Sequence, residues 1–186
     1  MSLEALVVGD SVTRIPSREA TGSQHPDLLD WLHSGRLTLV DERKEMIGSR
    51  ARSANDKVLV ADAFARRAQY ANAAAMLRAA VNDNPRDAEA WLALGNALVE
   101  HADGALTQPA LLAYRRAAEL DAGGVGPGYF LGLALIRQGQ FGQARSAWAG
   151  TLEGAGPDAA GRELLAQRLA RLDALLRGEG PVSVPQ

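Results

Sequence analysis

The central part of the chain repeats a pattern of small and large apolar residues at helical spacing. Three consecutive segments, 54–87, 88–124 and 125–158, each contain a first stretch with a small residue near its centre and a second stretch rich in alanine. The small residues are Ala61, Gly95 and Gly132, and the second stretches pair Ala73 with Leu77, Ala110 with Tyr114, and Ala144 with Trp148. Apolar positions three and four apart indicate amphipathic helices, so the pattern predicts three helix pairs.

The small residues are expected where the two helices of a pair cross. A larger side chain there would hold the helix axes beyond their usual spacing of about 8–10 Å. A helix–turn–helix unit of about 34 residues with this pattern is typical of the tetratricopeptide repeat, or TPR. We therefore expect an all-α fold, a TPR solenoid of three helix pairs. The alternative is an ordinary helical bundle in which the alanine spacing is incidental.

The segments outside the repeats differ from them in pattern. Residues 1–25 carry many turn signals and are expected to be a flexible N-terminal segment. Residues 26–53 are expected to form short N-terminal helices, one from Pro26 to His33 and one from Val40 to Arg50. Residues 159–177 place leucines at helical spacing and predict a helix that caps the end of the stack. Residues 178–186 are expected to be a flexible tail.

Composition and charge argue against several classes of function. The chain has no cysteine, which excludes disulfides, thiolate metal sites and thiol catalysis. The formal net charge is −2 and no basic block occurs, so no nucleic acid partner is expected. Its three histidines lack metal-ligand spacing, and neither a phosphate-binding loop nor a serine nucleophile motif is found. We therefore expect no enzyme activity, no cofactor and no bound metal.

In a TPR solenoid the first helix of each pair lines a concave face, which is an extended binding surface. The helical register places a mixed polar and apolar set of residues on that face. This predicted peptide-binding groove consists of Asn55, Val58, Asp62, Arg66, Leu92, Asn96, Val99, Tyr129, Leu133, Ile136 and Arg137. Asn96 is central and offers both a donor and an acceptor to a ligand backbone.

The predicted groove lacks the basic residues with which one TPR subclass grips a C-terminal carboxylate. The matching positions hold Val58, Tyr129 and Leu133. An apolar strip suits an amphipathic helix laid along the groove, with anchors three, four and seven residues apart. We therefore expect a helical ligand, contacted by Asn96, Tyr129 and Leu133, and expect that truncating Tyr129 weakens binding with little loss of stability.

The second and third units also resemble one particular family. The resemblance is carried by 61–64 (ADAF), 90–98 (AWLALGNAL), the insertion 103–107 (DGALT), 129–134 (YFLGLA) and the segment 140–148. Over residues 40–177 the chain resembles the cytochrome c-type biogenesis TPR proteins (CcmH/CycH-like) of Gram-negative bacteria. That resemblance implies a periplasmic domain that holds apocytochrome c, chiefly by its C-terminal helix, for the haem-ligation machinery.

The same family implies an anchor in the inner membrane. No hydrophobic span is visible in this sequence, so we expect any anchor to lie outside this chain. Two other hypotheses stay open at this point. One is a generic TPR scaffold for envelope protein-complex assembly with a different client, and the other is an enzyme with an unrecognised site.

Overall fold

The computed structural model describes residues 38–178, and these residues form eight helices and no strand. The helices are α2 (Leu39–Ile47), α3 (Asp56–Ala65), α4 (Tyr70–Asp83), α5 (Ala88–His101), α6 (Gln108–Leu120), α7 (Gly126–Arg137), α8 (Phe141–Gly154) and α9 (Arg162–Leu176). The predicted all-α class is confirmed. The helix predicted from Pro26 to His33, the segment 1–25 and the tail beyond residue 178 lie outside the described residues.

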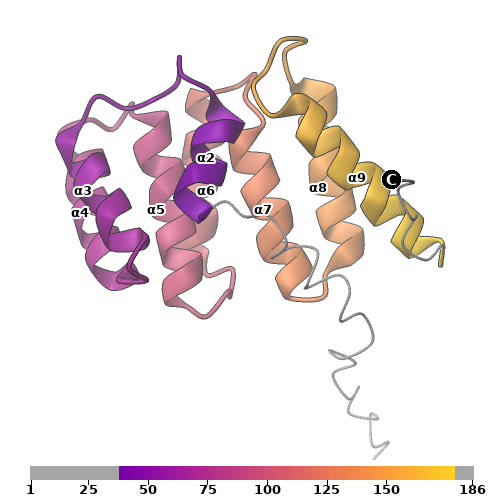
Figure 1. The fold of residues 1–186 in the computed structure, drawn as a ribbon, viewed down its shortest axis with the longest axis horizontal. Coiled ribbons are helices and arrows are strands. Elements are labelled where there is room, and N and C mark those ends of the chain that lie inside the picture. The colour runs from indigo at the N-terminus through magenta and orange to yellow at the C-terminus, as the bar shows by residue number, and fades with distance from the viewer. Residues whose placement is uncertain (1–37, 179–186) are drawn as a thin grey trace, which may run out of the picture.

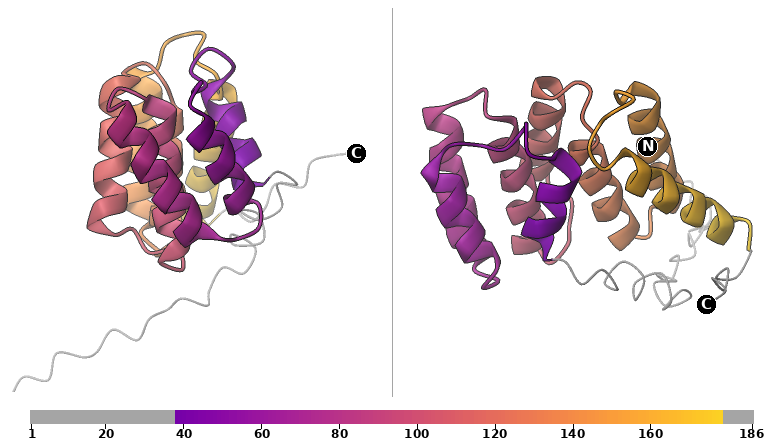
Figure 2. Two further views of the ribbon diagram at one scale, coloured as in Figure 1. Left: turned by 90° about the vertical axis from the view of Figure 1, so that its left-hand side faces the viewer. Right: turned by 45° about the horizontal axis from the view of Figure 1, so that its top comes forward.

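Successive helices from α3 to α9 pack side by side in sequential pairs, forming a row (Figure 1). The odd-numbered helices α3, α5 and α7 are the first members of the pairs, and α4, α6 and α8 are the second members. Helix α2 does not extend the row but contacts α3, α5 and α7. Figure 2, in its left view, shows α2 and α9 on the same side of the row. The row is therefore covered on one side by α2 and, at its C-terminal end, by α9.

Polar side chains fix where several helices begin. Asn55, Asp87 and Thr107 are the N-caps of α3, α5 and α6, and each side chain accepts a hydrogen bond from a backbone amide of the first turn. Such caps satisfy amide groups that have no partner inside the helix. Pro109 follows Thr107 in the first turn of α6, where its fixed φ fits the helix.

The small residues of the repeats lie where the paired helices approach most closely. A Cβ added to Gly95 would lie 2.5 Å from the ring of Tyr114, and one added to Gly132 would lie 1.9 Å from Nε1 of Trp148. Both aromatic side chains are buried. Each glycine therefore leaves room for a large side chain from the second helix of its own pair, as the pattern predicted.

One glycine with positive φ ends α2, and another precedes the first residue of α9. Gly48 ends α2 with φ +67, and Gly161 precedes α9 with φ +74. Both positions are also crowded, because a Cβ at Gly48 would lie 2.9 Å from the Cβ of Ala160 and one at Gly161 would lie 2.7 Å from Sδ of Met46. The end of α2 and the start of α9 are therefore in direct contact. The C-terminal helix starts a few residues later than the sequence suggested.

Candidate ligand-binding face

The face formed by α3, α5 and α7 is the candidate functional site, and α2 is seated on it. Helix α2 turns three residues toward this face, spaced three apart along the chain. Val40 is 2 % exposed, Arg43 3 % and Met46 1 %. Spacing of three to four residues places side chains on one face of a helix. The binding face predicted from sequence therefore carries a helix of the same chain.

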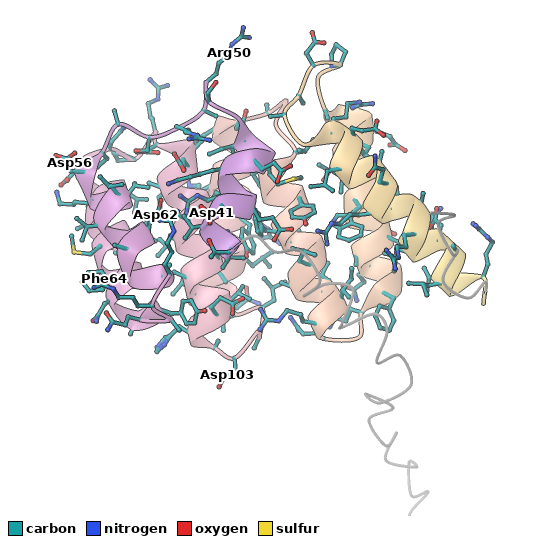
Figure 3. The ribbon with its side chains drawn as sticks, viewed as in Figure 1. Asp41, Arg50, Asp56, Asp62, Phe64 and Asp103 are labelled. Carbon is teal, nitrogen blue, oxygen red and sulfur yellow. The ribbon has the colours of Figure 1, made fainter. Side chains whose placement is uncertain are left out.

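A buried ion cluster marks the centre of this contact. The Nη2 atom of Arg43 donates to both carboxylate oxygens of Asp62, at 2.9 and 3.0 Å. The same nitrogen and Nε donate to Oε1 of Glu89, at 2.9 and 3.1 Å. Asp62 comes from α3 and Glu89 from α5, so one guanidinium joins α2 to two first helices. Figure 3 shows Asp62 on the side of α3 that faces α2.

The cluster is completed by neighbours that satisfy the remaining carboxylate oxygens. Lys44 of α2 lies 2.8 Å from Oδ2 of Asp62. Oε2 of Glu89 accepts a hydrogen bond from the backbone amide of Ser53, in the segment between α2 and α3. Buried charges are tolerated when they are paired and hydrogen-bonded. The two acids are therefore balanced by two basic residues, both from α2.

A second polar contact lies at the other edge of α2. Glu42 accepts hydrogen bonds from the hydroxyl of Tyr129 and from Nη2 of Arg168, the latter at 3.1 Å. The guanidinium of Arg168 lies 5.5 Å from the centre of the Tyr129 ring, in the geometry of a cation–π contact. Arg168 belongs to α9, so this contact links α2, α7 and α9.

On the outer side, Asp41 of α2 pairs with Arg66 at 2.7 Å. Its other carboxylate oxygen accepts the hydroxyl of Thr38 at 2.6 Å. These two hydrogen bonds, that of Thr38 first, hold the pKa of Asp41 below its ordinary value. Both members of the ion pair are exposed, so it contributes little to stability.

In the structure the predicted groove residues do not form an open surface. Seven of them are buried: Val58, Asp62, Leu92, Asn96, Val99, Tyr129 and Ile136. Leu133 is partly buried, and Asn55 is the N-cap of α3 rather than part of an open surface. Arg66 and Arg137 are exposed, and Arg137 pairs with Glu100. As ligand contacts these residues remain a prediction.

Two of the predicted contacts have structural partners. Oδ1 of Asn96 accepts the hydroxyl of Tyr114 at 3.0 Å, whereas its Nδ2 has no hydrogen-bond partner among the described residues. Tyr129 stacks on Trp148 with ring centres 6.0 Å apart. Burial raises the pKa of both Tyr114 and Tyr129. Contrary to the sequence-based expectation, Tyr129 lies in the core, so truncating it removes packing.

Sequence reasoning missed Arg43, which is the centre of the contact. Arginine is usually exposed, so a pattern of apolar positions does not include it. The available signal was its position midway between Val40 and Met46, on the same side of a predicted helix. An arginine flanked in this way by apolar residues is a candidate for a buried ion pair.

The insertion in the middle unit also has a structural role. Asp103 and Gly104 have positive φ values of 52 and 89, which turn the chain between α5 and α6. A Cβ at Gly104 would lie 2.7 Å from the guanidinium of Arg137. The insertion therefore brings this loop against the end of α7, and Figure 3 shows Asp103 at its tip.

Three further findings bear on function. In residues 38–178, no group of histidine and acidic side chains is placed to hold a metal ion. No helix of this part of the chain is long and apolar enough to cross a membrane. Comparison with protein-family models finds none that matches the chain, and comparison with curated proteins likewise finds no match.

Proposed function

We propose that the row α3–α8 is a TPR array that binds a helical segment of another protein on the face of α3, α5 and α7. One observation carries this proposal: a helix already lies on that face. Helix α2 is seated there through Val40, Arg43 and Met46, all buried. Amphipathic helices that bind in grooves use anchors at this spacing. The protein acts by binding rather than by catalysis.

The close helix crossings support the TPR assignment. Ala61, Gly95 and Gly132 occupy equivalent places, and each is buried in the first helix of its pair. A solenoid of such pairs exposes its first helices on a common surface. The contact of α2 with α3, α5 and α7 fits that arrangement, because one short helix reaches a member of every pair.

For the client we propose the C-terminal helix of an unfolded c-type apocytochrome. The support is the resemblance to cytochrome c-type biogenesis TPR proteins, which implies a periplasmic location, an inner-membrane anchor outside this chain and a role beside the haem-ligation machinery. A client that is disordered when free loses about 2–5 kcal/mol of interaction energy in ordering. Binding is therefore moderate, and the client leaves once haem is attached and the cytochrome folds.

The test is a titration of the full chain with apocytochrome c, holocytochrome c and a peptide of the cytochrome C-terminal helix. We expect the apo form and the peptide to bind and the folded holo form to bind far less. Raising the salt concentration should change affinity little, because buried contacts are screened less than exposed ones. Equal affinity for the holo form, or no binding of the peptide, would remove this client and leave a generic scaffold for envelope assembly.

A further inference from the structure

Helix α2 has the features of a bound ligand rather than of a repeat helix. Among residues 38–178 no helix pairs with it as the repeat helices pair with each other, and it lies on the face formed by the first members of the pairs. It is also short, spanning Leu39–Ile47. Isolated helices shorter than about 12–15 residues are marginal in water. The helical form of α2 therefore depends on the face beneath it.

The charges on this face are arranged to receive a cation. Asp62 and Glu89 are 2 % and 3 % exposed and come from different helices. Left without a partner, two buried carboxylates so close together would be costly. Arg43 satisfies both through four hydrogen bonds. The face therefore requires a basic side chain, preferably a planar guanidinium, from whatever helix occupies it.

Apolar contacts lie on both sides of this charge. Met46 belongs to the same hydrophobic cluster as Leu92 and Tyr129. Val40, one turn in the other direction, lines a small internal cavity together with Ala61 and Asn96. The face thus has three adjacent positions along the axis of α2: one apolar, one acidic and one apolar.

The fit of α2 is incomplete at one position. Asn96 is 5 % exposed and lines the cavity beside Val40, yet its Nδ2 donor has no partner among the described residues. A buried donor without an acceptor is destabilising. A helix with an acceptor side chain in place of Val40 would recover part of that loss. Another helix can therefore fit this face better than α2 does.

We infer that α2 is a replaceable occupant of the face, and that the client helix must supply an arginine, an apolar residue three positions after it, and an apolar or hydrogen-bond-accepting residue three positions before it. This inference rests on the proposed function in placing the client on α3, α5 and α7. The segment between Ile47 and Asp56 tethers α2 beside the face. Short flexible tethers give effective concentrations in the millimolar range. A client competes with that tethered helix, which keeps the face covered when no client is present.

The test uses a full-length variant with Arg43→Asp and Met46→Asp, called here the undocked variant. Both new carboxylates lie on α2: one stands where Arg43 meets Asp62 and Glu89, and the other replaces a buried apolar side chain. They oppose docking, whereas the face itself is unchanged. The probe is a fluorescein-labelled, end-capped peptide of residues 38–50 of this chain. The matched control is the same peptide with Arg43→Gln.

The peptide should bind the undocked variant at least about tenfold more tightly than the unaltered chain, in which α2 competes. The Arg43→Gln peptide should bind the undocked variant about 30-fold or more weakly than the original peptide, since it leaves Glu89 without a basic partner and Asp62 with Lys44 alone. Fluorescence anisotropy measures both. No binding of the original peptide, or equal binding of the two peptides, would overturn the inference.

If the undocked variant fails to fold, hydrogen exchange of the unaltered chain tests instead whether α2 can leave the face on its own. A replaceable α2 exchanges its amides by local opening, well before those of α5 and α7. Exchange of α2 only together with the whole row would show that it is an integral part of the fold. Neither measurement contains a cytochrome. Failure of the apocytochrome titration alone would therefore reject the proposed client and leave this inference standing.

Discussion

The first helix pair, α3 with α4, and the third, α7 with α8, both cross closely, but the side chains at the two crossings differ in size. In the first pair Ala61 lies in the same buried cluster as Leu77, among many alanines. In the third pair Gly132 lies against Trp148, where even one added carbon would overlap. The larger the residue on the second helix, the smaller the residue on the first. Each crossing therefore matches one small side chain with one larger side chain, Ala61 with Leu77 and Gly132 with Trp148.

This difference also changes how each pair is stabilised. The third pair depends on a few large side chains: Trp148 stacks on Tyr129 and donates from Nε1 to the Tyr129 carbonyl at 3.0 Å. The first pair depends on many small contacts, because its buried cluster consists largely of alanine. A single substitution should therefore damage the third pair more than the first.

The largest expected effect is that of Trp148→Ala. It removes the largest fully buried side chain and its hydrogen bond, and should lower the free energy of unfolding by about 3–5 kcal/mol. Leu77→Ala, at the matching position of the first pair, should cost less, about 2–3 kcal/mol. Urea unfolding followed by circular dichroism measures both. Equal losses would show that the two pairs are stabilised alike.

The next prediction tests directly whether a large side chain on the second helix requires a glycine on the first. Gly132→Ala places a Cβ 1.9 Å from Trp148 and should cost about 1–3 kcal/mol. Gly95→Ala should cost less, because Tyr114 lies 2.5 Å from the added carbon.

A double-mutant cycle gives the control for this prediction. Combining Gly132→Ala with Trp148→Leu reproduces the small and large residues of the first pair. The cost of Gly132→Ala should then fall by about 1 kcal/mol or more relative to its cost beside Trp148. An unchanged cost would mean that the glycine is required for another reason.

Alkaline pH should weaken the fold through a tyrosine in every pair, since burial also raises the pKa of Tyr70 in the first pair. Burial raises the pKa of Tyr114 and Tyr129 above the ordinary 10.0, and these residues lie in the second and third pairs. Above this pH the unfolded chain loses the tyrosine proton while the folded chain keeps it, so stability falls as pH rises. The slope is about 1.4 kcal/mol per pH unit for each such tyrosine. Tyr114→Phe should reduce the slope in melting experiments, and an unreduced slope would contradict the assignment.

The smallest effect concerns the start of the first pair. Asn55 caps α3 by accepting from the amide of Lys57, whereas Val125 at the start of α7 makes no side-chain cap. Asn55→Ala should therefore cost about 1 kcal/mol. The matched control is Asn72→Ala, at an exposed position inside α4, which should cost nothing. A similar loss in both variants, measured by thermal melting, would argue against the cap.

Much of the fold follows from the sequence because each pair satisfies its contacts locally. The small residue and its large partner lie within one unit, as Gly132 and Trp148 do, so their spacing carries the signal. The covering of the candidate site could not be predicted in this way. It depends on Arg43 meeting Asp62 and Glu89, which lie 19 and 46 residues away. Helix α2 belongs to no repeat, so no internal comparison places it.

The contact between Glu42 of α2 and Arg168 of α9 joins residues 126 positions apart. Contacts between neighbouring helices are local and form fast, whereas contacts of long separation must wait for the loop between them to be ordered. During folding the row of helices should therefore assemble before α2 and α9 meet across it. The link between α2 and α9 should therefore form last, after the contacts of Arg43 with Asp62 and Glu89, which are only 19 and 46 residues apart.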